Sequence, residues 1–169
     1  MARTERDRPY SQFNFIVSWQ AASDNEGDSL GESDVWGGFQ EISGLGLEIT
    51  VAEYRAGSYA TNEPIKITGM VKTPDVTLKR GVMGRGELYK WINAVRDGAQ
   101  NHLKNVSIKL LGEDRNPDSP AQEWRLLKAR PMKWTGPSLN GKGTDLAVEE
   151  LVLSAESIDL LPDESDKAE

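Results

Sequence analysis

The sequence predicts a mainly β fold, with two packed antiparallel sheets that form a sandwich or open barrel and one α-helix on the flank. Apolar and polar residues alternate in several short segments, such as 13–20 and 106–110, which is the period of a half-buried strand. Helical spacing occurs clearly in one place, where apolar residues recur at i, i+3, i+4 and i+7: Leu88, Trp91, Ile92 and Val95. Many short strands with a single helix favour two sheets over a helical bundle.

The first strand is predicted at residues 13–20 and the second at 35–43, loosened by Gly37 and Gly38. A glycine break then opens the longest strand, at 45–54, which returns as the other arm of a hairpin at 65–70. The apolar face of the long strand ends at Val51, although its composition stays typical of a strand up to Tyr54. A strand that extends beyond its own core meets either a partner chain or solvent.

A short strand at 76–80 precedes the helix, which is predicted from Glu87 to Asp97. Glu87 lies in the first turn, where the helix dipole favours an anion, and Gly98 suits a left-handed cap. Further strands are predicted at 106–110, 122–129 and 146–155. In the last one the apolar phase changes, which predicts a bulge or a strand that passes from one sheet to the other.

The length of 169 residues favours one domain, predicted at 13–161, with an N-terminal arm at 1–12, an acidic loop insert at 22–34 and a polar tail at 162–169. The chain has no cysteine, so disulfides and thiolate metal sites are excluded. It has no apolar run near the roughly 20 residues of a membrane span. No apolar segment follows the charged N-terminus, so we expect no signal peptide and synthesis in the cytoplasm.

The net charge of −7 argues against a general nucleic-acid binder, because such proteins present a basic face. The negative net charge is compatible with a conduit for nucleic acid, since a channel wall that repels phosphate lets the polyanion slide through without binding.

Three blocks of sequence, in the expected order over residues 13–158, resemble the tail tube proteins of contractile phages and phage-tail-like injection systems. The first block has Phe39, Ser43-Gly44-Leu45, Glu48, Tyr54-Arg55 and Gly57. The middle block has Leu78-Lys79-Arg80-Gly81 and then a helix with Leu88 and Trp91. The closing block has Trp124, Ala129, Pro131, Lys133, Gly136-Pro137 and Leu139, then a strand with Glu149, Leu151 and Leu153.

This resemblance implies a structural inner-tube subunit. Six copies would close into a ring whose sheets join in one barrel, and the rings would stack into a tube. The implied partners are the sheath, the baseplate, the tail terminator and a cargo of DNA or protein effector inside the lumen, in a virion tail or injection particle. The resemblance implies no enzymatic activity, cofactor, metal or membrane insertion.

We expect contacts in three places. Ring contacts are predicted on the long strand and the turn after it, at Gly44, Leu45, Glu48, Tyr54, Arg55, Gly57 and Tyr59. The acidic insert, with Asp24, Glu26 and Asp28, is predicted to stack rings. The exposed helix face, with Lys90, Asn93 and Arg96, is predicted to meet the sheath.

Other chemistries fit the sequence less well. Residues 136–144 resemble a phosphate-binding loop, but Gly143 replaces the Ser or Thr that would hold Mg²⁺ and a strand follows. Glycines before the helix, with Arg80 and Arg85, suggest an anion site, although a flexible connection is favoured. The acidic insert lacks the complete spacing of a calcium loop. His102 is the only histidine and has no paired base or nucleophile near it in sequence.

Two further sets of residues suggest a catalytic or a binding role. Adjacent Glu149 and Glu150 face opposite sides of a strand and cannot share one catalytic site. Tryptophans suggest an alternative function, a carbohydrate-binding β-sandwich module that stacks sugars on exposed rings. Trp91 and Trp124 fit core positions. For Trp36 and Trp134 the sequence leaves both a core position and an exposed, sugar-stacking position open.

Overall fold

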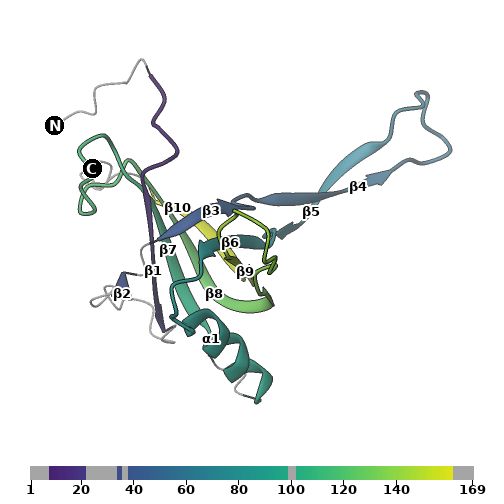
Figure 1. The fold of residues 1–169 in the computed structure, drawn as a ribbon. Helices are drawn as coiled ribbons and strands as arrows, with labels where there is room; N and C mark the ends of the chain where they lie inside the picture. Colours follow the sequence, from purple (N-terminus) through teal and green to yellow (C-terminus); the bar gives the residue numbers. More distant parts are fainter. Residues whose placement is uncertain (1–7, 22–33, 36–37, 99–101, 162–169) are drawn as a thin grey trace.

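Residues 8–21, 34–35, 38–98 and 102–161 are described by a computed structural model (Figure 1). These ranges contain ten strands and one helix, in the order β1 (Phe15–Ala21), β2 (Asp34–Val35), β3 (Phe39–Ser43), β4 (Glu48–Tyr54), β5 (Ile65–Lys72), β6 (Val76–Gly81), α1 (Glu87–Arg96), β7 (Lys104–Leu110), β8 (Gln122–Thr135), β9 (Val148–Ser154) and β10 (Ser157–Leu161). The predicted fold class is confirmed, because the strands form two packed antiparallel sheets with one flanking helix. The helix is too short to span a membrane, and no other helix occurs in these ranges.

Strand β8 belongs to both sheets. Its first half pairs with β7 and β10, and β7 continues through β1 to β2. Its second half pairs with β9, and that sheet continues through β6 to β3. The hairpin of β4 and β5 lies outside both sheets and projects from the body (Figure 1).

Two irregularities mark the passage of β8 from one sheet to the other. Lys128 has a positive φ of 49°, and its amide donates to Asn105 Oδ1 at 3.0 Å where the register with β7 shifts. The register with β9 shifts between Pro131 and Lys133. An extra residue bends a strand and increases its twist, which turns β8 towards the second sheet.

The core lies between the two sheets and the helix. Alternation along β6 buries Val76 and Leu78, and alternation along β9 buries Leu151 and Leu153. The facing sheet supplies buried residues from β1, β7 and β8: Val17, Trp19, Val106, Ile108, Leu126 and Ala129. Burial of this apolar set is the main force that holds the two sheets together.

Helix α1 covers one end of the core, with Leu88 and Trp91 buried. The Trp91 ring lies 5.8 Å from the Trp19 ring, and its Nε1 donates to the carbonyl of His102 at 2.9 Å. The predicted cap is confirmed, since Gly98 has a φ of 99° and donates to the carbonyl of Val95 at 3.1 Å.

Three predicted strand boundaries are wrong. The segment 35–43 is two strands in different sheets, and Gly38, with a φ of 102°, lies just before the second of them. The long strand begins at Glu48 rather than residue 45. Strand β8 extends to Thr135 rather than stopping at 129, because bulges let it continue past Pro131 into the second sheet.

The last predicted strand, 146–155, corresponds to β9, which spans Val148–Ser154. Strand β10, which the sequence patterns do not predict, follows at Ser157–Leu161 in the other sheet. Leu146 is 87% exposed, and the buried phase of β9 is Glu149, Leu151 and Leu153. The charged residue Glu149 therefore occupies a core position, and this interrupts the alternation of apolar residues in the sequence.

Candidate assembly surfaces

The hairpin of β4 and β5 is the most exposed regular structure in the described ranges. Each strand pairs only with the other, and every residue of β5 is exposed. The hairpin nevertheless presents large apolar side chains that are about half exposed or more: Ile49, Val51, Tyr54, Ile65, Ile67, Met70 and Val71. An isolated two-stranded hairpin is at best marginally stable in water. This composition therefore indicates a surface that another body covers.

Cross-strand register assigns the hairpin side chains to two faces, because directly opposed residues in an antiparallel pair share a face. Near the body, Ile49 opposes Val71, and Val51 of the same face lies two residues further on. We call these three residues the root patch. The opposite face there carries the charged pair Glu48 and Lys72.

The arrangement is reversed towards the turn. Ala52 opposes Ile67 and Tyr54 opposes Ile65, and these four residues form what we call the tip patch. The charged residues Glu53 and Lys66 oppose each other on the other face. The hairpin therefore has two separate apolar patches, one on each face and at different distances from the body.

A bulge lies between the two patches. Two residues of β5, Gly69 and Met70, stand opposite Thr50, whose Oγ1 donates to the carbonyl of Met70 at 2.9 Å. A Cβ on Gly69 would lie 2.7 Å from Thr50 Oγ1, so a larger residue here would displace the Thr50 side chain from its hydrogen bond. Such a bulge increases the twist of the ribbon.

Arg55 organises the loop at the end of the hairpin. Its Nε donates to the carbonyl of Thr61 at 3.1 Å, and its Nη2 lies 3.4 Å from both the carbonyl of Tyr59 and Asn62 Oδ1. The backbone amide of Tyr59 donates to the carbonyl of Ala56 at 3.1 Å. Arg55 and Tyr59, both predicted as ring contacts, therefore hold this loop together within the chain.

The other residues predicted as ring contacts lie in different environments. Glu48 and Tyr54 are exposed on the hairpin, and Gly57 is exposed in its loop with open space around it. Leu45 is half-buried and packs against the core. Gly44 has a φ of 91°, and a Cβ there would overlap the carbonyl oxygen of Asp75, so an intrachain close approach requires this glycine.

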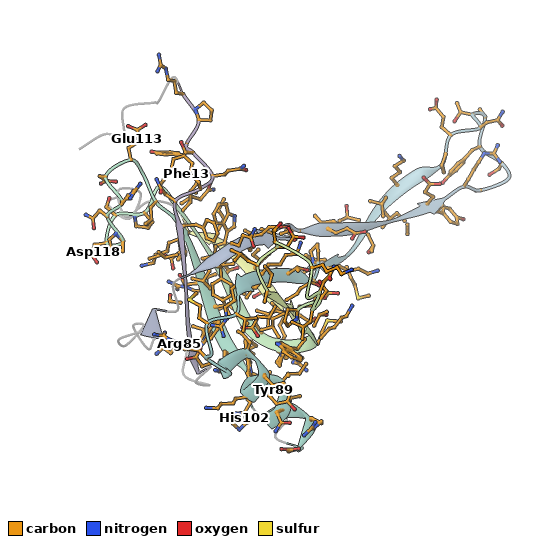
Figure 2. The ribbon with its side chains drawn as sticks, in the orientation of Figure 1. Phe13, Arg85, Tyr89, His102, Glu113 and Asp118 are labelled. Carbon is orange, nitrogen blue, oxygen red and sulfur yellow. The ribbon has the colours of Figure 1, made fainter. Side chains whose placement is uncertain are left out.

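A cleft of about 500 Å³ opens beside the base of the hairpin, between β1, β3, β7 and β8. Its lining is mostly apolar and includes Phe13, Phe39, Ile42, Leu45 and Trp124. Phe13 is 70% exposed and lies beside the start of β1 (Figure 2). Sequence patterns do not predict this cleft, because its walls come from segments far apart in the chain.

The helix face predicted to meet the sheath is only partly exposed. Lys90 and Arg96 are exposed, but the prediction that Asn93 is exposed is wrong. Asn93 is half-buried, and its Nδ2 donates to Asp97 Oδ2 at 3.1 Å. Tyr89, labelled in Figure 2, is 44% exposed and its ring lies 5.2 Å from the ring of Trp134.

A buried ionic network links strands β6, β8 and β9 of the second sheet with the helix. Arg80 Nε lies 2.7 Å from Glu149 Oε1, and Arg80 Nη1 lies 3.3 Å from Glu87 Oε2. Arg80 Nη2 donates to the carbonyl of Arg85 at 2.9 Å, and Trp134 Nε1 donates to Glu149 Oε2 at 3.1 Å. The guanidinium is thus fully engaged within the chain, so the anion site suggested by Arg80 and Arg85 does not form around it.

The remaining candidate sites also have structural explanations. The segment 136–144 leads into strand β9 rather than a helix, and Glu149 is buried while Glu150 lies on the other side of that strand. Within the described ranges no group of three or more histidines or carboxylates gathers in a metal-binding arrangement. The acidic insert residues Asp24, Glu26 and Asp28 lie outside the described residues.

The carbohydrate-binding alternative is not supported. Trp19 and Trp91 are buried, and Trp124 and Trp134 are half-buried and packed against the core, so these four rings serve the packing of the subunit. Trp36 lies outside the described residues.

Comparison with known proteins gives a consistent result. The family model of the T4-like virus tail tube protein gp19 matches residues 11–159. A chain from the sheath-tube complex of an extracellular contractile injection system (PVC) in its extended state is 29% identical, with a TM-score of 0.73 over 92% of this chain and 93% of that one. A chain from the tube-terminating cap of the anti-feeding prophage (AFP) is 27% identical, with a TM-score of 0.73 over 95% and 99%.

A chain from the six-fold symmetrised AFP baseplate shares the fold, with a TM-score of 0.77 at 23% identity over 92% of this chain and 97% of that one. No curated protein matches this chain.

Proposed function

The chain belongs to the T4-like virus tail tube protein family, and from this membership we propose that it is the inner-tube subunit of a contractile tail or injection particle. Six copies close into a ring, and rings stack into a tube that conducts the cargo, either DNA or a protein effector. The observation that supports this most directly is the projecting hairpin, whose exposed apolar patches need another copy to cover them.

The proposed partners are those that surround similar chains in solved assemblies: a sheath outside the tube, a baseplate at one end and a terminating cap at the other. Similarity to the PVC and AFP chains favours an injection particle of that kind. The proposed role of the subunit is structural, and we assign it no catalytic role, cofactor or metal.

Three contact regions are proposed. The hairpin, with Glu48 and Tyr54, contacts the neighbouring copy, and Arg55, Gly57 and Tyr59 shape its loop for that contact. The acidic insert, with Asp24, Glu26 and Asp28, mediates contacts between rings. The outer surface of α1, with Lys90 and Arg96, meets the sheath.

Residues 13–161 form the tube domain in this proposal, with the arm 1–12 and the tail 162–169 outside it. Synthesis and folding take place in the cytoplasm. Because the chain has no cysteine, its fold needs no oxidising compartment.

Electron microscopy of the purified full-length protein tests the proposed function. We expect six-fold rings or tubes with a central channel. A protein that stays dispersed as monomers at every concentration tried, alone and with its sheath protein, would contradict the assignment.

A further inference from the structure

We propose that Asn140 is a self-modification site, at which the backbone amide of Gly141 attacks the side-chain amide of Asn140 and releases ammonia. The two residues lie in the connection between β8 and β9, within the segment 136–144 that none of the proposed subunit contacts uses. The reaction does not depend on assembly, because every protein group that takes part belongs to one loop of one chain.

A tight turn holds Asn140 in a defined geometry. The amide of Gly143 donates to the Asn140 carbonyl at 3.1 Å, and the amide of Lys142 donates to Asn140 Oδ1 at 3.1 Å. A side chain that accepts from the amide two residues further on mimics a backbone turn. All four residues of the turn are exposed, so the side-chain amide is held over the following backbone while water reaches it.

Gly141 supplies a nucleophile with little hindrance. The residue is exposed, and a Cβ built on it would have nothing within 4 Å. Glycine has no Cβ of its own to obstruct the approach of its nitrogen to Asn140 Cγ, and its backbone reaches conformations closed to other residues. Gly141 therefore follows the turn into a five-membered imide ring without displacing another part of the protein.

The chemistry needs only water and a dissolved base. Base removes the proton of Gly141 N, this nitrogen forms a bond to Asn140 Cγ, and the developing negative charge moves to Oδ1. The Lys142 amide, which already donates to Oδ1, stabilises that charge as the donors of an oxyanion hole do. The bond from Cγ to Nδ2 then breaks, Nδ2 takes up a proton and leaves as ammonia, and a cyclic imide remains.

Water opens the imide at either of its two carbonyl carbons. Addition at Cγ restores the main chain and gives aspartate. Addition at the main-chain carbonyl carbon gives isoaspartate, in which the chain runs through the side-chain carbon. Either product adds one negative charge to a chain whose net charge is −7. Isoaspartate also lengthens the backbone, so the hydrogen bond that Gly143 donates across the turn loses its geometry.

A second asparagine provides an internal control. Asn140 is the only asparagine in the sequence that glycine follows. Asn116 makes the same kind of side-chain contact, because its Oδ1 accepts from the Asp118 amide at 3.0 Å. Pro117 follows it, however, and proline has no N–H proton to lose. Asn116 therefore has the turn geometry without the nucleophile.

Peptide mapping by mass spectrometry tests the reaction in the full-length protein, aged at physiological temperature in mildly alkaline buffer. We expect the mass increment of deamidation at Asn140, as a mixture of aspartate and isoaspartate, and none at Asn116. Gly141→Ala should keep the thermal midpoint of the parent protein, since its Cβ meets open space. Deamidation in this variant should slow at least about tenfold, which corresponds to a barrier about 1.4 kcal/mol higher.

Two results would overturn the proposal. One is an Asn140 that keeps its amide as long as Asn116 does. The other is aspartate as the sole product, formed as fast in Gly141→Ala as in the parent protein, because direct hydrolysis by water needs no neighbouring amide.

Pro117→Gly is the converse test. The substitution supplies the missing N–H beside a side chain that already accepts an amide, and it lies in an exposed loop away from the core. We expect Asn116 to deamidate in this variant and to give both isomers. Pro117→Ala, which gains the N–H together with a Cβ, should react more slowly than Pro117→Gly. An Asn116 that stays intact in Pro117→Gly would overturn the role given to the turn at Asn140.

Discussion

Arg80 and Glu149 form a buried ion pair, with 2.7 Å between Arg80 Nε and Glu149 Oε1 and both side chains less than a tenth exposed. The pair joins adjacent strands β6 and β9, in which the two residues are direct register partners. Glu87 and the indole of Trp134 complete its hydrogen bonds. A buried charge is tolerated only when it is paired and hydrogen-bonded in this way.

Removal of one partner of this pair should destabilise the subunit strongly. Glu149→Ala leaves the Arg80 guanidinium buried with only Glu87 as a counter-ion, and loss of one member of a buried pair costs about 3–5 kcal/mol. Chemical denaturation followed by tryptophan fluorescence measures this free energy of unfolding.

A surface ion pair between β6 and the neighbouring strand β3 provides the control. Lys79 and Glu41 lie 3.2 Å apart at the surface, and Glu41→Ala should cost no more than about 1 kcal/mol. Equal losses from the two substitutions would show that the buried network contributes no more than a surface pair.

Trp91→Ala should cost about 3–5 kcal/mol, as expected for truncation of a buried aromatic side chain. The side chain is 4% exposed, contacts Trp19 and donates to the carbonyl of His102. Lys90, the preceding residue of the helix, is exposed, so Lys90→Ala should change stability by less than about 0.5 kcal/mol. A thermal midpoint of Trp91→Ala within error of that of Lys90→Ala would refute the proposed core role.

Gly44→Ala should destabilise the subunit by at least about 1–2 kcal/mol, since the position combines a positive φ with a close approach to the carbonyl of Asp75. Gly57→Ala is the matched control, because a Cβ there meets open space. Calorimetry of both variants measures the difference. Similar midpoints would mean that the turn at Gly44 adjusts without cost.

Much of the architecture follows from local patterns in the chain. The helix has a single clear period, and the hairpin is indicated by an apolar face that ends while strand composition continues. Ile65, Ile67 and Val71 are exposed, as expected for a hairpin that extends beyond the core of its own subunit. These features can be predicted from the sequence because they depend on residues that are only a few positions apart.

Other features depend on contacts distant in sequence and could not be predicted. Glu149 occupies a core position because Arg80, 69 residues away, neutralises it. The continuation of β8 past residue 129 depends on Lys128 adopting a positive φ opposite Asn105. The cleft, likewise, combines Phe13, Phe39 and Trp124 from three separate strands or their edges.

Tyr54 and Arg55 are adjacent but should fail in different ways when substituted. Tyr54→Ala removes a half-exposed ring from the tip patch, so we expect normal stability and loss of ring and tube formation in electron micrographs. Arg55→Ala removes the contacts to Thr61, Tyr59 and Asn62, so the hairpin loop becomes mobile while the strands persist. Amide hydrogen exchange should then rise in residues 56–63 alone. Assembly of Arg55→Ala should recover at higher protein concentration, because a loosened loop adds an ordering cost without removing the apolar contact. If Tyr54→Ala and the double variant Tyr54→Ala with Arg55→Ala both assemble like the parent protein, the tip patch is not a subunit contact.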